Sequence, residues 1–178
     1  MPQDVLSVSC VGLVSPLGYT PQSSAAALRA RIPAFTELVY RERSGENIIG
    51  AMVPDVPIEL RGRERLSALA RLLFETLSQE LMEQFRWSQI PIFVCVPERE
   101  RPGPRLLDEL ASLGPAFRFP DARHIEAGQT SAFEALAEAR ALLANPRVAA
   151  CAIVAVDSMI DARVLTWLDG LRRLKTSE

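Results

Sequence analysis

A glutamine stands at a position where many enzymes place a nucleophile. In the stretch Arg123–Ala144, a short extended segment meets a turn at Gly128–Thr130 and continues into an alanine-rich helix. A strand that breaks into a helix presents one side chain, here Gln129, beside the free N–H groups and the positive end of the helix dipole. Gln cannot act as a nucleophile or a general base. We therefore expect Gln129 to cap the turn and the helix.

Three other polar positions could take part in chemistry. His124 is the single histidine and lies just upstream of the turn, so a role as a base is conceivable. A lone histidine beside apolar residues is more often structural or exposed, and the spacing does not establish a Ser/His/Asp arrangement with Ser131. Asp157 and Ser158 follow an apolar run, at the kind of strand end where α/β sheets bind ligands.

The cysteines predict neither a metal site nor a disulfide framework. Cys10, Cys95 and Cys151 each lie inside an apolar run, as expected for small core residues whose thiol pKa is raised by burial. One histidine and no Cys-x-x-Cys motif make a zinc site improbable. The glycine-containing turn Gly12–Gly18 lacks the spacing and the lysine of a phosphate loop. We expect no cofactor and no metal.

Composition excludes further classes of function. The 178 residues are 48% hydrophobic and 24% charged, with a net charge of −2, which predicts a single domain over residues 1–178. A pI near 5.6 argues against nucleic-acid binding. The Arg61–Arg65 stretch predicts a solvated face, and a patch for a phosphate or an acidic partner is the alternative. No span and no signal peptide are recognised, so we expect a cytoplasmic protein.

Apolar periodicity predicts alternating strands and helices. Buried strands are expected at Val5–Val14, Ile90–Val96 and Val148–Val156, the last a central strand. A hairpin or two short edge strands are expected over Leu38–Val53, and an extended segment over Phe117–Ala127. Helices are expected from Thr20-Pro21 onward and at Arg63–Phe85, Arg105–Leu113, Thr130–Ala144 and Arg163–Leu174. This order predicts an α/β layer protein with a mixed, largely parallel sheet and flanking helices.

With the elements in this order, the chain resembles the N-terminal half of a β-ketoacyl synthase, an enzyme of the thiolase-like superfamily. Four stretches carry the resemblance: the first strand and turn at Val11–Gly18, the helix start at Arg65–Ala70, the turn and helix at Gly128–Leu143, and the strand end at Val154–Ser158. Their order and spacing agree over almost the whole chain. The resemblance implies one thiolase-like half domain.

The departures from the family bear on catalysis. Gln129 stands at the position of the nucleophilic cysteine, and Thr130 and Ser131 replace the glycines that follow it. The catalytic histidines belong to a C-terminal half, which would begin about where this chain ends. In decarboxylating or chain-length-controlling relatives a glutamine occupies this position, where it orients a malonyl carboxylate or thioester. That role needs histidines from a partner.

One half of a two-layered enzyme would leave apolar helices and a sheet edge uncovered, and such surfaces mark interaction sites. We therefore expect a homodimer or heteromer, and Trp87 and Trp167 are of a type that anchors interfaces. The resemblance implies a non-catalytic adaptor or co-chaperone, as in type VI secretion effector loading. The alternatives are a split ketosynthase or malonyl-carrier-protein decarboxylase, acting with an acyl carrier protein and a separate C-terminal half, and a stand-alone acyl-chain-binding domain.

Overall fold

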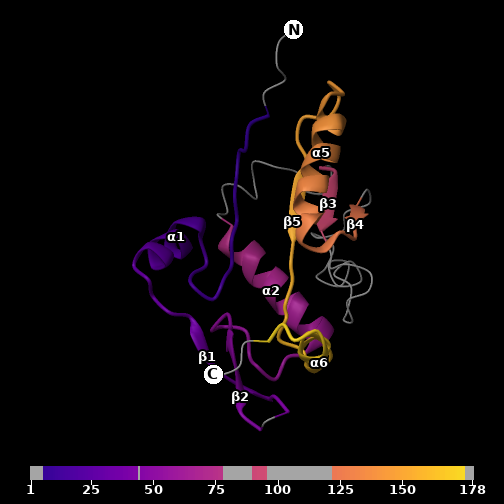
Figure 1. Cartoon of the computed structure of the whole chain (residues 1–178). Helices are drawn as coiled ribbons and strands as arrows, with labels where there is room; N and C mark the ends of the chain where they lie inside the picture. The colour runs from indigo at the N-terminus through magenta and orange to yellow at the C-terminus, as the bar shows by residue number, and fades with distance from the viewer. Residues whose placement is uncertain (1–5, 44, 78–89, 96–121, 175–178) are drawn as a thin grey trace. The chain divides into compact units, whose positions relative to one another are not determined.

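The computed structural model describes residues 6–43, 45–77, 90–95 and 122–174 (Figure 1). These residues fall into two compact units, which are described one at a time. The first unit contains residues 6–11, 77, 90–95 and 122–157, and the second contains residues 12–43, 45–76 and 158–174.

A parallel three-stranded sheet forms the centre of the first unit. Its strands are β3 (Ile92–Cys95), β4 (Ala122–Ile125) and β5 (Ala152–Ala155), in the order β4-β3-β5. Both neighbours run parallel to β3, and every residue of β3 is buried. The prediction of an α/β protein with a parallel sheet is confirmed. The strand predicted within Val148–Val156 is confirmed as β5, but its predicted central position is wrong, because β5 lies at an edge of the described sheet.

One helix covers a face of this sheet. α5 (Ser131–Leu143) packs alongside β3 and β5 (Figure 1). Ala135 and Ala139, one turn apart, are buried against Phe93 of the central strand. Their methyl side chains allow the helix backbone to approach the sheet closely. The predicted helix is confirmed, and its neighbouring apolar residue Leu136 lies outside the buried face, since half of its surface is exposed to solvent.

The second unit begins with a capped helix. α1 (Pro21–Arg29) has Thr20 as its N-cap and proline as its first residue, as predicted. The Thr20 hydroxyl oxygen accepts from the Ser23 N–H at 3.1 Å, and the Ser23 hydroxyl oxygen accepts from the Thr20 N–H at 3.1 Å. This reciprocal pair is a capping box, which satisfies N–H groups that have no partner inside the helix.

We expect Thr20→Ala to lower the free energy of unfolding by about 1 kcal/mol, because the Ser23 N–H loses its acceptor. Thr20→Ser keeps a hydroxyl at the same place and should retain most of the stability. Urea denaturation followed by circular dichroism measures both. An equal loss in the two variants would show that the threonine methyl group, and not the cap, contributes the stability.

An antiparallel hairpin and two helices complete the second unit. β1 (Phe35–Arg41) pairs with β2 (Asn47–Ala51), which confirms the predicted hairpin. α2 (Gly62–Thr76) is described for the first part of its predicted range, and α6 (Ala162–Gly170) is shorter than predicted. The apolar core joins the hairpin to α6 through four buried side chains, Leu38, Ile48, Ile160 and Leu165.

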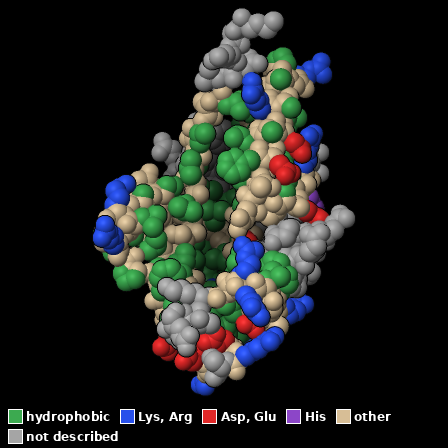
Figure 2. Space-filling model, in the orientation of Figure 1, with side chains coloured by type: hydrophobic (Ala, Val, Ile, Leu, Met, Phe, Trp, Pro, Cys, Tyr) green, Lys and Arg blue, Asp and Glu red, His purple; other side chains and the backbone are tan. Residues whose placement is uncertain are grey.

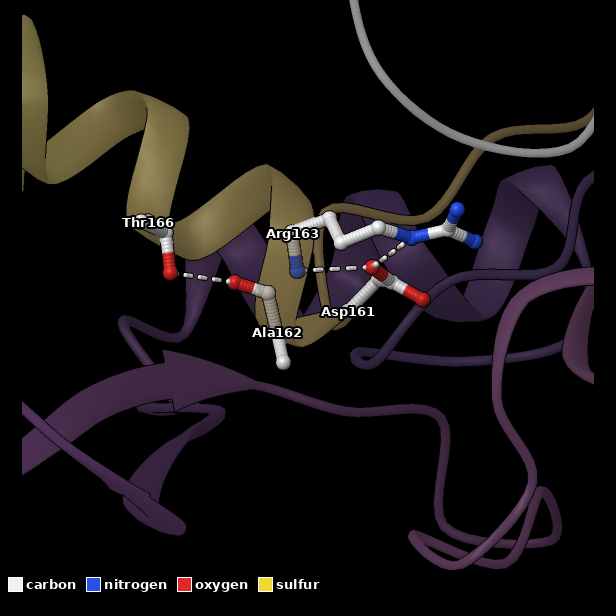
Figure 3. Close-up of polar contacts among 4 residues, drawn as sticks. All are labelled: Asp161, Ala162, Arg163 and Thr166. Atoms are coloured by element: carbon white, nitrogen blue, oxygen red, sulfur yellow. Dashed lines mark hydrogen bonds and ion pairs between the residues drawn. The ribbon is translucent and has the colours of Figure 1, made fainter.

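An aspartate fixes the start of α6. The Asp161 Oδ1 atom accepts from the Arg163 N–H at 2.9 Å and lies 3.8 Å from the Arg163 Nε atom (Figure 3). Farther along, the Thr166 hydroxyl donates to the Ala162 carbonyl oxygen at 2.8 Å. A carboxylate at the N-cap pairs well with the positive end of the helix dipole. The Asp161 carboxylate therefore interacts with the first residues of its own helix.

The prediction of a buried strand over Val5–Val14 is wrong for residues 6–14, which are here called the N-terminal segment. They belong to no strand, and they make no hydrogen bond within the part of the chain that the structure describes. Val8 keeps 77% of its surface exposed and Val11 keeps 63%. The apolar pattern records a preference for burial, but a strand also needs a hydrogen-bonded neighbour, which is not supplied here.

The turn after this segment is confirmed, since the Ser15 and Gly18 backbones exchange two hydrogen bonds. The helix predicted over Arg105–Leu113 lies outside the described residues. Within the described ranges, no helix is both long enough and apolar enough to cross a membrane.

Candidate functional site at the carboxyl edge of the parallel sheet

The three parallel strands end at the same edge of their sheet. Cys95, the last residue of β3, is in register with Ile125 of β4 and Ala155 of β5. Ligands of open α/β sheets bind beyond the carboxyl ends of the strands, where the loops begin. The turn after β4 carries Gln129, and the chain after β5 carries Asp157, so both predicted site residues leave the sheet at this edge.

Backbone conformation and two hydroxyls shape the turn between β4 and α5. Gly128 has φ of 55°, the left-handed region that favours glycine, and it opens the short 3₁₀ helix η4 (Gly128–Thr130). The Thr130 hydroxyl donates to the Ala127 carbonyl oxygen at 3.0 Å, and the Ser131 hydroxyl donates to the Gly128 carbonyl oxygen at 2.6 Å. The side chains that follow Gln129 therefore hold the turn.

Gln129 itself is exposed, and its side chain makes no hydrogen bond within the described part of the chain. The N-cap of α5 is Thr130, and no side chain caps either α5 or η4. The interpretation of Gln129 as the capping residue is therefore corrected. Its amide stands beside the start of α5 with its hydrogen-bonding groups open to solvent.

The turn gives a matched pair of variants. Gln129→Ala should change the free energy of unfolding by less than about 0.5 kcal/mol, because the side chain contacts solvent. Ser131→Ala removes a short hydrogen bond from a side chain that is 5% exposed, and it should cost about 1 kcal/mol. Thermal denaturation at constant pH measures both. A larger loss in Gln129→Ala than in Ser131→Ala would contradict this account of the turn.

His124 and Ser131 are not joined as a catalytic pair. His124 is exposed on β4, where it is in register with Val94 of β3. Ser131 is buried, and its hydroxyl donates to the Gly128 carbonyl oxygen rather than to the imidazole. A hydroxyl is activated by a base within hydrogen-bonding reach. The arrangement does not provide that contact.

Sequence reasoning treated Cys95 only as a core residue, and the structure places it at the strand edge beside the turn. The side chain is buried, and the Ser131 side chain lies close to it. Burial raises the pKa of the Cys95 thiol, and the nearby Ser131 side chain has a smaller effect in the opposite direction. A thiol with a raised pKa is mostly protonated at neutral pH, so Cys95 behaves as a packed core residue, as predicted.

The remaining cysteines and the tryptophans differ from one another in placement. Cys151 is half-buried, and burial raises the pKa of its thiol. Cys10 is half-buried in the N-terminal segment, outside any strand, which corrects its predicted place in a core strand. Trp167 is half-buried on α6, and Trp87 lies outside the described residues.

No group of three or more His, Cys, Asp or Glu side chains suited to a metal ion occurs in the described ranges.

Arg65 corrects a prediction made from charge alone. The Arg61–Arg65 stretch was expected to be a solvated face, yet Arg65 keeps only 2% of its surface exposed. Its Nε atom donates to the Ser158 hydroxyl oxygen at 3.0 Å. Ser158, predicted as a ligand-binding residue at a strand end, thus accepts a hydrogen bond from a buried arginine within the second unit.

Comparison with known proteins adds no relative. No protein-family model, no curated protein and no solved structure matches the chain.

Proposed function

We propose that the protein is a non-catalytic, ketosynthase-like adaptor that works by binding another protein. The observation that carries this proposal is the exposure of large apolar side chains on the first unit. Val8 keeps 77% of its surface and Phe133 keeps 76%. Exposed apolar patches of this kind commonly mark protein interaction sites. Hydrophobic side chains reach the surface over much of the face drawn in Figure 2.

α5 supplies the best-defined part of this surface. Phe133 and Leu136 are three residues apart, so they lie on the same side of the helix, and both are exposed. The opposite side is the alanine stripe that packs on the sheet. An exposed aromatic residue on a helix whose opposite side packs on a sheet is well suited to bind a partner protein.

The backbone supports the same proposal. β5 is an edge strand of the described sheet, and the N-terminal segment makes no hydrogen bond within the described ranges. Both present peptide groups to which an extended chain from a partner can add by strand pairing. The segment also carries no charged side chain, so nothing in it opposes such pairing.

The resemblance to ketosynthases without a nucleophilic cysteine suggests the setting, which is an accessory or co-chaperone role in type VI secretion effector loading. The proposal is tested by measuring binding between this protein and one candidate partner at a time. The full chain is titrated by biolayer interferometry with the purified product of each gene that neighbours its own. Saturable binding to a secretion component supports the proposal. Absence of binding to every product, together with a monomeric protein, contradicts it.

A second candidate is a split ketosynthase subunit or a malonyl-carrier-protein decarboxylase. It is favoured by one observation, the exposed Gln129 amide beside the N-terminus of α5, where a thioester or carboxylate oxygen would also meet free N–H groups. Malonyl carrier protein is incubated with the chain and with each neighbouring product. Decarboxylation that is lost in Gln129→Ala and retained in the exposed control His124→Ala would replace the adaptor proposal.

A further inference from the structure

An arginine in the second unit is buried without a carboxylate. Besides the hydrogen bond to Ser158, the Arg65 Nη1 atom donates to the Pro57 carbonyl oxygen at 3.1 Å. Both acceptors are neutral. Within the described ranges, no Asp or Glu forms an ion pair with Arg65. The positive charge is therefore enclosed without a countercharge.

This arrangement is energetically unfavourable as it stands. An arginine stays protonated at any ordinary pH, so it cannot escape burial by losing its charge. Buried charges in proteins are normally paired. Arg65 also lies in the first turns of α2, where the helix dipole favours a negative charge. Burial lowers the pKa of the Arg65 guanidinium, and the Tyr40 hydroxyl, not a carboxylate, is the group that opposes this shift.

A second polar group of this unit also lacks a partner. The Tyr40 hydroxyl is buried and has no hydrogen-bond partner among the residues that the structure describes. Its ring packs against the core that contains Leu38 and Ile48, and the guanidinium carbon of Arg61 lies 5.8 Å from the ring centroid. A buried donor without an acceptor is uncommon in native proteins and calls for an ion, a water or a ligand.

The two groups need the same kind of partner. The Tyr40 hydroxyl lacks an acceptor within the described ranges, and the Arg65 guanidinium lacks a negative charge. A carboxylate supplies both, because its two oxygens match the guanidinium fork and can accept from a tyrosine hydroxyl. The two residues that accept from the guanidinium are less enclosed than Arg65 itself, since Pro57 is exposed and Ser158 is half-buried. The exposed Arg61 adds a second positive charge close to the Tyr40 ring.

We propose that Arg65 and Tyr40 form a binding site for a carboxylate group, with Ser158 and Pro57 holding the guanidinium in position. The buried carboxylate of this unit, Asp161, does not fill the role, because it accepts from the start of its own helix (Figure 3). The site does not depend on the adaptor proposal. A carboxylate site here agrees with the alternative interpretation of the Arg61–Arg65 stretch, in which these residues bind an acidic partner.

The test observes Arg65 directly in the full-length protein. Arginine Nε–H signals of ¹⁵N-labelled protein are recorded while acetate is added at constant ionic strength, and sodium chloride serves as the reference. The Arg65 signal, assigned by its loss in Arg65→Met, should shift saturably with acetate and not with chloride. Tyr40→Phe should weaken acetate binding about tenfold, since it removes one hydrogen bond to a charged group. Arg43→Gln, at an exposed arginine paired with Asp169, should leave the titration unchanged.

The outcomes separate cleanly. No saturable shift, an equal response to chloride, or unchanged affinity in a folded Tyr40→Phe variant would overturn the proposal. Tyr40→Phe keeps the ring in the core, so it remains informative if Arg65→Met fails to fold. A glutamate blocked at both ends identifies the source of the carboxylate. Tighter binding than acetate indicates a protein side chain, and equal or weaker binding indicates a small free acid.

Discussion

Phe93→Ala is expected to lower the free energy of unfolding by about 3–5 kcal/mol, the range for removing a fully buried aromatic side chain. Phe93 is fully buried in the central strand, where it packs against Ala135 and Ala139 of α5. The two alanines are too small to fill the space that the ring leaves. Because helix and sheet meet at this contact, the lost burial and the new cavity add together. Chemical denaturation followed by tryptophan fluorescence and circular dichroism measures the change.

Phe133→Ala is the matched control for this prediction. The same substitution on the exposed side of α5 removes little buried area, and it should change the free energy of unfolding by less than about 0.5 kcal/mol. Similar losses for Phe93→Ala and Phe133→Ala would mean that the packing of α5 on the sheet is not as described.

The second large effect is on binding. In the adaptor proposal, Phe133→Ala should weaken association with the partner, whether a second copy or another protein, by about thirtyfold. This corresponds to the ~2 kcal/mol of an interface anchor. The Phe133 ring is 76% exposed, and the opposite side of α5 already packs on the sheet. Little conformational entropy is therefore lost when the ring becomes buried at an interface. Titration calorimetry or sedimentation equilibrium gives the dissociation constants.

Phe35→Ala controls for a general loss of exposed aromatic surface. Phe35 is 74% exposed on β1 of the second unit, whereas the surface assigned to the partner belongs to the first unit. It should leave the dissociation constant unchanged. Equal weakening by the two variants, or weakening by Phe35→Ala alone, would contradict the assignment of the interface to α5.

Local signals in the sequence predicted much of the fold. Thr20 followed by proline predicted the start of α1, because a hydroxyl acceptor and a fixed φ act within a few residues. The hairpin and β3 followed from short apolar runs between turn residues. The order of the strands in the sheet was not predictable in this way, because the apolar run that contains β5 is as apolar as the run that contains β3. Which strand is central depends on pairing between distant segments.

The errors have a common physical origin. The N-terminal segment has the composition of a buried strand. Composition indicates that a segment favours burial, but it does not show whether other residues of the chain pack over it. Arg65 shows the reverse case, a charged side chain that was expected at the surface and is buried by contacts with Pro57 and Ser158. Both outcomes depend on residues distant in sequence.

The candidate site was predictable in place but not in detail. A strand followed by Gly128 and an alanine-rich helix predicted a sharp turn at the carboxyl edge of a sheet, and that turn is present. The hydrogen bonds that hold it come from Thr130 and Ser131 rather than from Gln129. Spacing along the chain does not determine which of three adjacent polar side chains faces inward.

The most direct test of the adaptor proposal is the molar mass of the purified protein in solution. Light scattering coupled to size-exclusion chromatography is run on the protein alone and after mixing with each neighbouring gene product. The proposal predicts a mass of at least twice 19.6 kDa, or a stable complex with one product, either of which Phe133→Ala disrupts. A monomer of 19.6 kDa under all of these conditions would contradict it.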